Sequence, residues 1–501
     1  MAREGSSRGS ARTRTRFAPS PSGDLHVGAV RTALYSWAWA RHCGGSFVVR
    51  IEDTDRSRVS PDAVAATMGA LAWLGLDWDE GPDVGGEFGP YRQSERLGLY
   101  REWVDKFLAD GTAYHCYCSQ EELDGERDEQ RTQGLPSGYA GHCRELTTAQ
   151  VTAYRREGRR PVVRFRMPEG STVVRDTIRG EIVFDHANVP DFVVQRSDGY
   201  PLYNLAVSVD DALMKITHIV RGDDLLASTP RQIAILAAMG VAEDDLPVYT
   251  HTPDILAADG SPLSSWHRAA GISWYRDHGY LPEAVVNYLA LLGWSPGGDR
   301  EELTLDSLVE SFDLERVGAT AGRLDPRKLD AINGDKIRAL SPEEFVGRTM
   351  PFLTRAGLVS DPPAPGQTRT VAAAAPLIQE RLVHLTEAAD MLAFLLVPEH
   401  VFDVDPEEAA RILTEDAKAV LEAAEAALRA LPDWTDEAIE RALRRTLVDE
   451  LGRRPKRAFG PVRVAVTGSR VSPPLFESLT LLGRERTLAR ITRALDHHVG
   501  V

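Results

Sequence analysis

The sequence predicts a doubly wound α/β domain that is split by an insertion and followed by an all-α region. Strand and helix patterns alternate in the N-terminal part, which is how a doubly wound sheet begins. Residues 115–190 break this alternation, and after about residue 326 the chain becomes rich in Ala, Leu, Glu and Arg, as in the helical pattern of residues 407–431. A length of 501 residues, with 43% hydrophobic and 26% charged residues, suits several globular units.

The alternation starts close to the N-terminus. An extended segment ends at residues 17–19, a helical pattern begins near Val27, and a glycine pair at residues 44–45 ends it. The apolar run 46–51 is typical of a buried parallel strand. Strand and helix patterns then resume at 192–195, 202–214, 216–221 and 225–239. Rossmann-type sheets bind ligands beyond the carboxyl ends of their strands, where Ser20 and Glu52 both fall.

The composition argues against a membrane-spanning or disulfide-rich protein. The longest apolar runs, such as residues 285–292, are too short to cross a bilayer, and no apolar segment follows the basic start. Four cysteines suit a reducing cytoplasm. The net charge of −16 neither supports nor excludes a nucleic-acid partner, because phosphate contacts need only a local basic face. We expect a cytoplasmic monomer whose residues 1–15, rich in Arg, Ser and Gly, form a disordered extension.

One motif joins the first strand to the first helix. It runs from Arg16 to Gly28 and reads RFAPSPSGDLHVG in one-letter code. A helix N-terminus offers free N–H groups and a partial positive charge, so this segment is a candidate phosphate cradle, and Gly28 lets a ligand approach closely. His26 is placed to donate to phosphate oxygens as charge builds in a transition state. A single His at a helix start is more often a cap or a surface residue, so the interpretation depends on the whole string.

This string resembles the first signature of class I aminoacyl-tRNA synthetases in its glutamyl form, where Ala-Pro-Ser-Pro-(Thr/Ser)-Gly precedes His-x-Gly. Further segments resemble later blocks of the glutamyl-tRNA synthetase family in the family's order: 50–55, 89–94, 198–204, 210–214, 220–224, 287–294 and a block near residue 330. The resemblance implies activation of L-glutamate with ATP and Mg, followed by transfer of the glutamyl group to the 3′ end of tRNA(Glu). It leaves tRNA(Gln) open as a second acceptor.

The resemblance also implies a division of the chain. We expect the extension at 1–15, the first half of the Rossmann-type catalytic domain at 16–115, an acceptor-binding insertion at 116–190, the second half at 191–250, a signature-loop and tRNA stem-contact region at 251–325 and a helical anticodon-binding domain at 326–501. Basic residues from Arg453 to Arg463 are candidates for phosphate contact, with a solvated charged face as an equal alternative. The helical region argues against the queuosine-modifying relative of the family, which lacks an anticodon domain.

The resemblance assigns five residues to the glutamate pocket: Arg16, Ser20, Glu52, Tyr203 and Arg221. The chemistry agrees, because glutamate carries two carboxylates and one ammonium. The planar forks of Arg16 and Arg221 suit the carboxylates, and Glu52 suits the ammonium. By the same resemblance, four residues bind ATP: His26, Gly28, Leu263 and Ser264.

Three of the four cysteines lie in the insertion. The run Cys116-x-Cys118 precedes Cys143, and three thiolates suit a structural, tetrahedral zinc ion with one further N or O ligand. In the glutamyl family and its queuosine-modifying relative this insertion often carries zinc, and in the relative a Tyr four positions before the last Cys completes the site. Tyr139 has that spacing, and His115 and His142 are alternative fourth ligands. Three free thiols that happen to cluster remain the alternative to a metal site.

The second signature departs from the family pattern. The family has a Lys-Leu-Ser-Lys-Arg type of loop shortly after Asp-Gly, whereas this chain has Pro262, Leu263, Ser264, Ser265 and Trp266 at those positions. The second lysine normally neutralises charge that develops on the pyrophosphate, and loss of one such contact costs about 10²–10³ in rate. Arg268, with His267, is the nearest basic group. By resemblance, the catalytic set is His26, Gly28, Ser264, Ser265 and Arg268.

Three hypotheses follow from this departure. The chain is a glutamyl-tRNA synthetase with reduced activity, a catalytically silent paralogue that binds tRNA or glutamyl-tRNA, or a synthetase whose amino-acid or tRNA choice has shifted. The set of Arg16, Glu52 and Arg221 favours an enzyme, because a protein that only binds tRNA has no need of a glutamate pocket.

Overall fold

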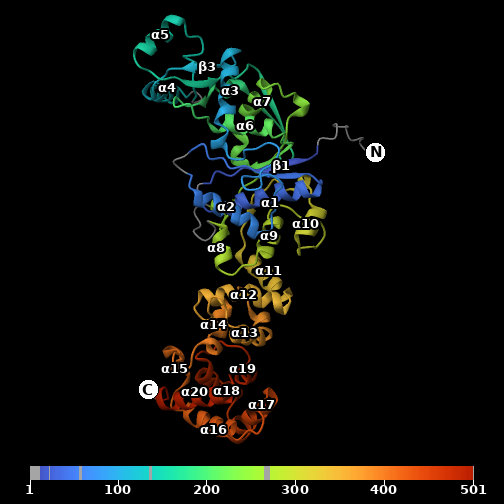
Figure 1. Cartoon of the computed structure of the whole chain (residues 1–501), viewed down its shortest axis with the longest axis vertical. Helices are drawn as coiled ribbons and strands as arrows, with labels where there is room; N and C mark the ends of the chain where they lie inside the picture. Colours follow the sequence, from blue (N-terminus) through green and yellow to red (C-terminus); the bar gives the residue numbers. More distant parts are fainter. Residues whose placement is uncertain (1–11, 22, 56–58, 135–137, 264–270, 500–501) are drawn as a thin grey trace, which may run out of the picture. The chain divides into compact units, whose positions relative to one another are not determined.

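The computed structural model describes residues 12–21, 23–55, 59–134, 138–263 and 271–499. The chain divides into two compact units: the first holds the residues up to Trp274 together with Val285–Pro326, and the second holds Tyr275–Ala284 together with Arg327–Val501. In Figure 1 the strands belong to the first unit, and the elements drawn for residues beyond 330 are helices. Over the described ranges, no helix combines the length and the hydropathy that a bilayer span requires.

Six strands form the main sheet of the first unit, in the order β2 (Ser46–Val49), β1 (Arg14–Phe17), β8 (His218–Gly222), β9 (Val248–Thr252), β5 (Ser171–Asp176) and β6 (Gly180–Asp185). Neighbouring strands are parallel, except that β5 and β6 form an antiparallel hairpin. All residues of β2 are buried, and α1 (Val27–His42) packs against β1, β2 and β8. This arrangement confirms the predicted α/β class, because parallel strands need crossover connections that cover the sheet.

A second, three-stranded sheet has its central strand in the predicted insertion and its outer strands at the two borders of that insertion. Its central strand β4 (Val162–Phe165) is antiparallel to both β3 (Ala113–Cys116) and β7 (Phe192–Gln195). Apolar side chains of this sheet share a core with α3 (Leu97–Ala109) and α6 (Tyr203–Leu213). By contrast, α4 (Gln120–Thr132) and α5 (Thr148–Arg156) bury none of their residues, and each starts with a capping box.

The strand pairings correct three expectations. Strand β1 begins at Arg14, so Arg14 and Thr15 pair with β2 and are not part of a disordered extension of 15 residues. The β5–β6 hairpin belongs to the main sheet, where Asp176 pairs with Tyr249, and not to an insertion that runs to residue 190. Conversely, β7 pairs with β4 in the insertion and does not open the second half of the catalytic sheet. A strand pattern records which side chains are buried but not which partner strand buries them.

The remaining elements of the first unit, with two helices that cross its border, are α2 (Pro61–Trp73), α7 (Thr229–Ala238), β10 (Ile255–Leu256), α8 (Ile272–Asp277), α9 (Pro282–Leu291), α10 (Leu305–Ser311) and β11 (Gly322–Arg323). Strands β10 and β11 form a small parallel pair of their own.

The second unit is helical, as predicted. Its helices are α11 (Pro326–Ala339), α12 (Pro342–Arg355), α13 (Pro365–Ile378), α14 (Glu387–Leu396), α15 (Pro406–Ile412), α16 (Ala417–Arg429), α17 (Asp436–Leu443), α18 (Pro455–Thr467), α19 (Leu475–Leu482) and α20 (Arg484–His497). They share one apolar core. The single helix expected at 407–431 is two helices, because Leu413 leaves the helical conformation with ψ at 47°.

The border between the units also differs from the expected one at residue 326. The segment Tyr275–Ala284 was expected in the signature-loop region, but it belongs to the helical unit. There Leu281 is buried in the helical core, and its backbone N–H donates to Oδ1 of Asn333 at 2.8 Å. A short segment can join a distant core in this way because burial of one or two apolar side chains is enough to hold it.

Candidate active site

Two of the predicted pocket residues, Ser20 and Glu52, follow the carboxyl ends of β1 and β2. The N–H of Arg50 donates to the Phe17 carbonyl and the N–H of Glu52 to the Pro19 carbonyl, both at 3.0 Å. This continued pairing brings the backbone of Ser20 next to Glu52. Ser20 itself is exposed, so its hydroxyl is open to a ligand.

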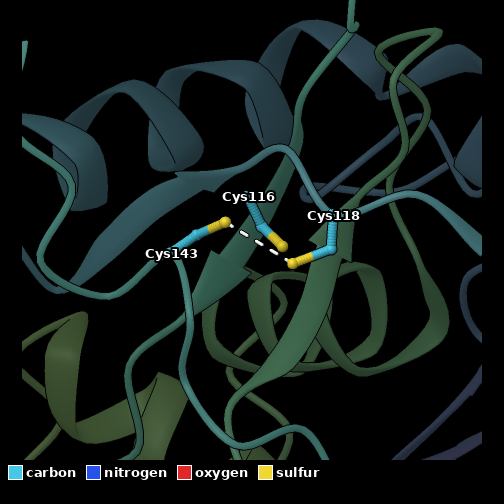
Figure 2. A group of neighbouring side chains, drawn as sticks. All are labelled: Cys116, Cys118 and Cys143. Carbon is cyan, nitrogen blue, oxygen red and sulfur yellow. Dashed lines mark hydrogen bonds between the residues drawn. The ribbon is translucent and has the colours of Figure 1, made fainter. Parts of the chain in front are cut away.

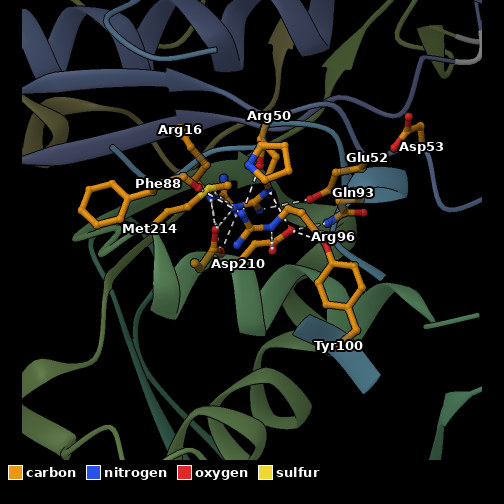
Figure 3. Close-up of polar contacts among 12 residues, drawn as sticks. Arg16, Arg50, Glu52, Asp53, Phe88, Gln93, Arg96, Tyr100, Asp210 and Met214 are labelled. Carbon is orange, nitrogen blue, oxygen red and sulfur yellow. Dashed lines mark hydrogen bonds and ion pairs between the residues drawn. The ribbon is translucent and has the colours of Figure 1, made fainter. Parts of the chain in front are cut away.

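Buried ion pairs hold Arg16 of β1 and Arg50, the residue that follows β2 (Figure 3). Nε of Arg16 lies 3.2 Å from Asp211, Nη1 of Arg50 lies 2.7 Å from the same carboxylate, and Nη2 of Arg50 lies 3.2 Å from Glu52. The Glu52 side chain is only 9% exposed. The side chain of Arg16 is therefore oriented by Asp211 on α6, and the side chain of Glu52 is oriented by Arg50.

Asp210, the neighbour of Asp211 on α6, is fully buried and organises a second group of polar side chains. Its carboxylate accepts from Nε of Arg96 at 2.6 Å, from Nε2 of Gln93 at 3.0 Å and from the hydroxyl of Tyr100 at 2.8 Å. Burial and this carboxylate raise the pKa of Tyr100. The hydroxyl therefore stays protonated and works as a donor.

Tyr203 interacts electrostatically with Glu52, Arg221 and Arg16. Burial raises the pKa of Tyr203, the Glu52 carboxylate raises it further, and Arg221 and Arg16 lower it. Burial also raises the pKa of Glu52, although Arg50 and Arg16 oppose the shift. Arg16, Glu52 and Arg221 are thus all within electrostatic range of Tyr203, and their assignment to a glutamate pocket stays a prediction.

Arg221 differs from the other arginines of the site in its partners. Its three hydrogen bonds run from Nε to Nε2 of His251 at 3.0 Å, from Nη1 to Gln232 at 2.7 Å and from Nη2 to Thr229 at 2.8 Å. An amide and a hydroxyl carry no charge, and among the described residues no acid contacts this guanidinium directly.

The helix predicted after the first motif is present as α1. His26 is the N-cap residue, and its Nδ1 accepts the N–H of Ala29 at 3.2 Å. An acceptor Nδ1 means that the neutral ring carries its proton on Nε2, which is then free to donate. A Cβ at Gly28 would lie 3.2 Å from Nδ1 of His26, so a larger residue would press on this ring.

The second signature is only partly described. Gly260 turns the chain with φ at 85°, and Asp259 accepts from the backbone and hydroxyl of Ser261. Leu263 is half-buried at the end of this segment. Ser264, Ser265 and Arg268 lie outside the described residues, so their predicted roles stay predictions.

The three insertion cysteines converge (Figure 2), and their Sγ atoms all lie within 4.8 Å of one another. The Sγ atoms of Cys118 and Cys143 are 3.5 Å apart, and the Tyr139 hydroxyl is 3.7 Å from Sγ of Cys116. Neighbouring sulfur ligands of a tetrahedral zinc ion lie about 3.8 Å apart, given a Zn–S distance of about 2.3 Å. The residues therefore fit the size of a zinc site.

Neither histidine alternative is part of this group. His115 follows the pleat of β3 to the exposed side, whereas the next residue, Cys116, is buried. His142 is 60% exposed and pairs with Glu126 at 3.3 Å. Of the three candidates for a fourth ligand, only Tyr139 lies beside a thiol.

Several residues of this site were not assigned a role from the sequence. Asp210 and Asp211 were visible as an acidic pair inside an otherwise apolar helix pattern, which signals buried charge with partners elsewhere. Asp176 and His251 gave no signal, because their contact joins residues 75 positions apart through a hairpin that the sequence placed in another domain.

Comparisons with known proteins find matches to both the N-terminal and the C-terminal part of the chain. Residues 12–331 match the catalytic-domain family described as class I tRNA synthetases (E and Q), and residues 344–495 match a family of anticodon-binding domains. A relative from Nocardioides sp., named glutamate–tRNA ligase, is 48% identical over 96% of this chain and 98% of its own. Another of that name, from Saccharopolyspora erythraea, is 50% identical over 96% of each. A crystal structure of a glutamate–tRNA ligase from Elizabethkingia meningosepticum, in complex with its amino acid, superposes with a TM-score of 0.81 at 30% identity and covers 97% of this chain and all of its own.

Proposed function

Because the chain belongs to the family of class I tRNA synthetases for glutamate and glutamine, we propose that it activates L-glutamate with ATP and transfers the glutamyl group to the 3′ end of tRNA(Glu). The observation that carries this proposal is the buried group of Arg16, Glu52 and Arg221 at the strand edge. Two fixed cations and one anion match the two carboxylates and the ammonium of glutamate.

In the first step, a carboxylate oxygen of glutamate attacks the α-phosphorus of ATP and pyrophosphate leaves. Magnesium bound with ATP supplies charge neutralisation on the phosphates. The chain positions the reactants: Arg16 and Arg221 hold carboxylate oxygens, Glu52 holds the ammonium, and Nε2 of His26 donates to a phosphate oxygen. In the second step, a ribose hydroxyl of the tRNA attacks the mixed anhydride and AMP leaves.

The helical unit supplies the reading of tRNA in this proposal. Of the basic residues expected to contact phosphates, Arg453 pairs with Asp416 at 2.7 Å, and Nη1 of Arg463 donates to the Pro473 carbonyl at 2.6 Å. These two side chains are engaged in contacts within the protein. Phosphate contact is therefore proposed for Arg454, Lys456 and Arg457, and the choice between tRNA(Glu) and tRNA(Gln) is left to experiment.

The test is aminoacylation by the purified full-length protein. Labelled glutamate is offered with transcripts of tRNA(Glu) and tRNA(Gln). The R221K variant is assayed in parallel, because lysine keeps the positive charge but lacks the planar guanidinium fork of Arg221. We expect charging of tRNA(Glu) that R221K reduces strongly. Charging with another amino acid, or charging that R221K leaves unchanged, would contradict the proposed pocket.

A second candidate function is a silent paralogue that binds tRNA without charging it. The specific observation in its favour is the pair Ser265 and Trp266, which replaces the Lys-Arg of the family pattern. Tight tRNA binding with no charging of either transcript would establish this alternative.

The raised pKa of Glu52 predicts a pH-dependent affinity for glutamate. A raised pKa means that Glu52 takes up a proton at a higher pH than an ordinary Glu, and the protonated acid cannot pair with the ammonium. We expect the KM for glutamate to rise on acidification, and at a higher pH than the titration of an ordinary Glu would cause. In an E52Q variant the KM should be about 10- to 150-fold higher at neutral pH, from loss of about 1.5–3 kcal/mol, and nearly independent of pH. A KM of E52Q that still rises in acid would assign the titration to another group.

We also propose a structural zinc ion on Cys116, Cys118, Cys143 and Tyr139. The support is the spacing of the four ligand atoms and the N–H of Tyr117, which donates to Sγ of Cys143 at 3.3 Å and would stabilise a thiolate. Zinc in such a closed four-ligand site holds the surrounding chain together and performs no chemistry.

Removal of one zinc ligand is expected to abolish stoichiometric zinc in the purified protein. C143S should lower the metal content from about one zinc per chain to a small fraction, and should expose β3 and β4 to hydrogen–deuterium exchange, because zinc binding and local folding are coupled. The control is C43S, which alters the exposed fourth cysteine. Equal zinc content in the two variants, measured by elemental analysis, would refute the site.

A further inference from the structure

The β5–β6 hairpin brings Asp176 into contact with His251, a neighbour of Arg221 in the candidate active site. Asp176, at the end of β5, accepts from Nδ1 of His251 at 2.7 Å and from the backbone N–H of His251 at 2.9 Å. His251 lies on β9 and contacts Arg221 on the neighbouring strand β8. The three side chains are at most 5% exposed. They form a buried chain of contacts across three adjacent strands of the main sheet.

The direction of these hydrogen bonds fixes the state of the histidine. Nε of an arginine can only donate, so Nε2 of His251 must be an acceptor. The ring proton then sits on Nδ1 and points at Asp176. A second proton on Nε2 would face the N–H of Arg221, so the geometry requires a neutral ring with one defined tautomer.

Asp176 is itself held rigidly. Its Oδ1 accepts the backbone N–H groups of Ile178 and Arg179 at 2.9 and 2.8 Å, in the turn that joins β5 to β6. Both carboxylate oxygens are therefore committed, and neither can rotate away from His251. The turn of the hairpin thus sets the position of the histidine ring.

We propose that Asp176 and His251 are positioning residues that aim the guanidinium of Arg221 at a carboxylate of the substrate. The proposal rests on the proposed function, in which that substrate is glutamate. A guanidinium has five N–H donors, and His251, Gln232 and Thr229 take three of those of Arg221. The two that remain are on the terminal nitrogens, which is the fork that binds a carboxylate in bidentate fashion.

The choice of a neutral histidine also preserves the charge of Arg221. An acid in direct contact would form an ion pair, as Asp211 does with Arg16, and would occupy N–H donors of the guanidinium. At Arg221 the acid is Asp176, which contacts the guanidinium only through the imidazole ring of His251. The other ionisable groups that face His251 are Tyr249 on its own strand and Asp223, which pairs with Arg179. Burial lowers the pKa of His251 and Arg221 adds to this effect, which agrees with a neutral ring.

A matched pair of variants separates the two contacts of His251 in the full-length protein. In H251Q the amide oxygen can replace Nε2 as the acceptor for Arg221, whereas in H251N the amide reaches only Asp176. We expect H251N to raise the KM for glutamate about 10- to 100-fold, with little change in kcat or in the KM for ATP. H251Q should stay within about threefold of the unmodified protein. Equal effects of both variants, or a loss in kcat alone, would overturn the positioning role.

The tautomer gives a second readout that does not depend on activity. In the full-length protein with nitrogen-15-labelled histidine, assigned by comparison with H251N, we expect the Nδ1–H form of His251 and no titration between about pH 6 and about pH 8. D176N should shift the proton towards Nε2. An Nε2–H tautomer or a titrating ring in the unmodified protein would refute the arrangement. Failure of the unmodified protein to bind glutamate in calorimetry, with the expected tautomer present, would instead refute the proposed function and the substrate named here.

Discussion

Introduction of the family's Lys-Arg pair, as S265K with W266R, is expected to raise the rate of glutamyl-tRNA formation about 10²–10³-fold. The lysine would supply positive charge where the pyrophosphate leaves, and between Lys215 and Lys328 the chain has no other lysine to do so. The measurement is single-turnover charging of tRNA(Glu) at saturating glutamate and ATP, so that the change is read in the chemical step and not in substrate binding.

The control is a pair of glutamines at the same positions, S265Q with W266Q, which have chain lengths similar to those of lysine and arginine but no charge. If the glutamine pair raises the rate as much as the Lys-Arg pair, removal of Trp266 is responsible and charge is not. If the unmodified protein already charges as fast as the Lys-Arg variant, a group such as Arg268 replaces the lysine. The first result would contradict the role of charge, and the second would contradict a degenerate signature loop.

Replacement of Asp210 by alanine is expected to lower the free energy of unfolding of the first unit by about 3–5 kcal/mol. The variant leaves Arg96, Gln93 and Tyr100 without the buried carboxylate that they share. An unpaired buried cation is costly because burial has removed its hydration. Hydrogen–deuterium exchange at the amides of β1, β2 and α6 measures the effect where it arises, since a chain of two units need not unfold in one step.

Asp128 provides the matched control for this prediction. It pairs with Arg131 at 2.9 Å on the surface of α4, with both side chains more than two-thirds exposed. D128A should cost less than about 1 kcal/mol, because water screens an exposed ion pair. A loss in D210A as small as that in D128A would mean that the buried network is not a source of stability.

The sequence predicts the elements of this fold better than their partners. The buried run at 46–51 and the helix at 202–214 correspond to β2 and α6 within a few residues, because burial on both faces and a helical period are local signals. The sheet to which the β5–β6 hairpin belongs depends on contacts with distant residues. The break between α15 and α16 depends on a turn of four residues that the Ala-rich pattern conceals.

The same limit applies to the site. Arg16, Glu52, Tyr203 and Arg221 were assigned by resemblance, and Tyr203 is within electrostatic range of the other three. The contacts that orient them were not predictable, because Asp211 and His251 act through hydrogen bonds that span 195 and 30 residues of sequence. The fourth zinc ligand is an intermediate case. Its spacing in the sequence left three candidates, and only the structure shows that His115 is on the exposed side of β3 whereas Tyr139 lies beside Cys116.

The excursion of Tyr275–Ala284 into the helical core has a consequence for dissection of the protein. The backbone passes between the two units three times, at residues 274–275, 284–285 and 326–327. A protease cut or stop codon after Pro326 would therefore not release an intact catalytic fragment. The remaining piece would carry Tyr280 and Leu281 without Asp330 and Asn333, to which they are hydrogen-bonded. A bisected chain should recover its activity only when both fragments refold together, as in a split protein whose halves complement each other.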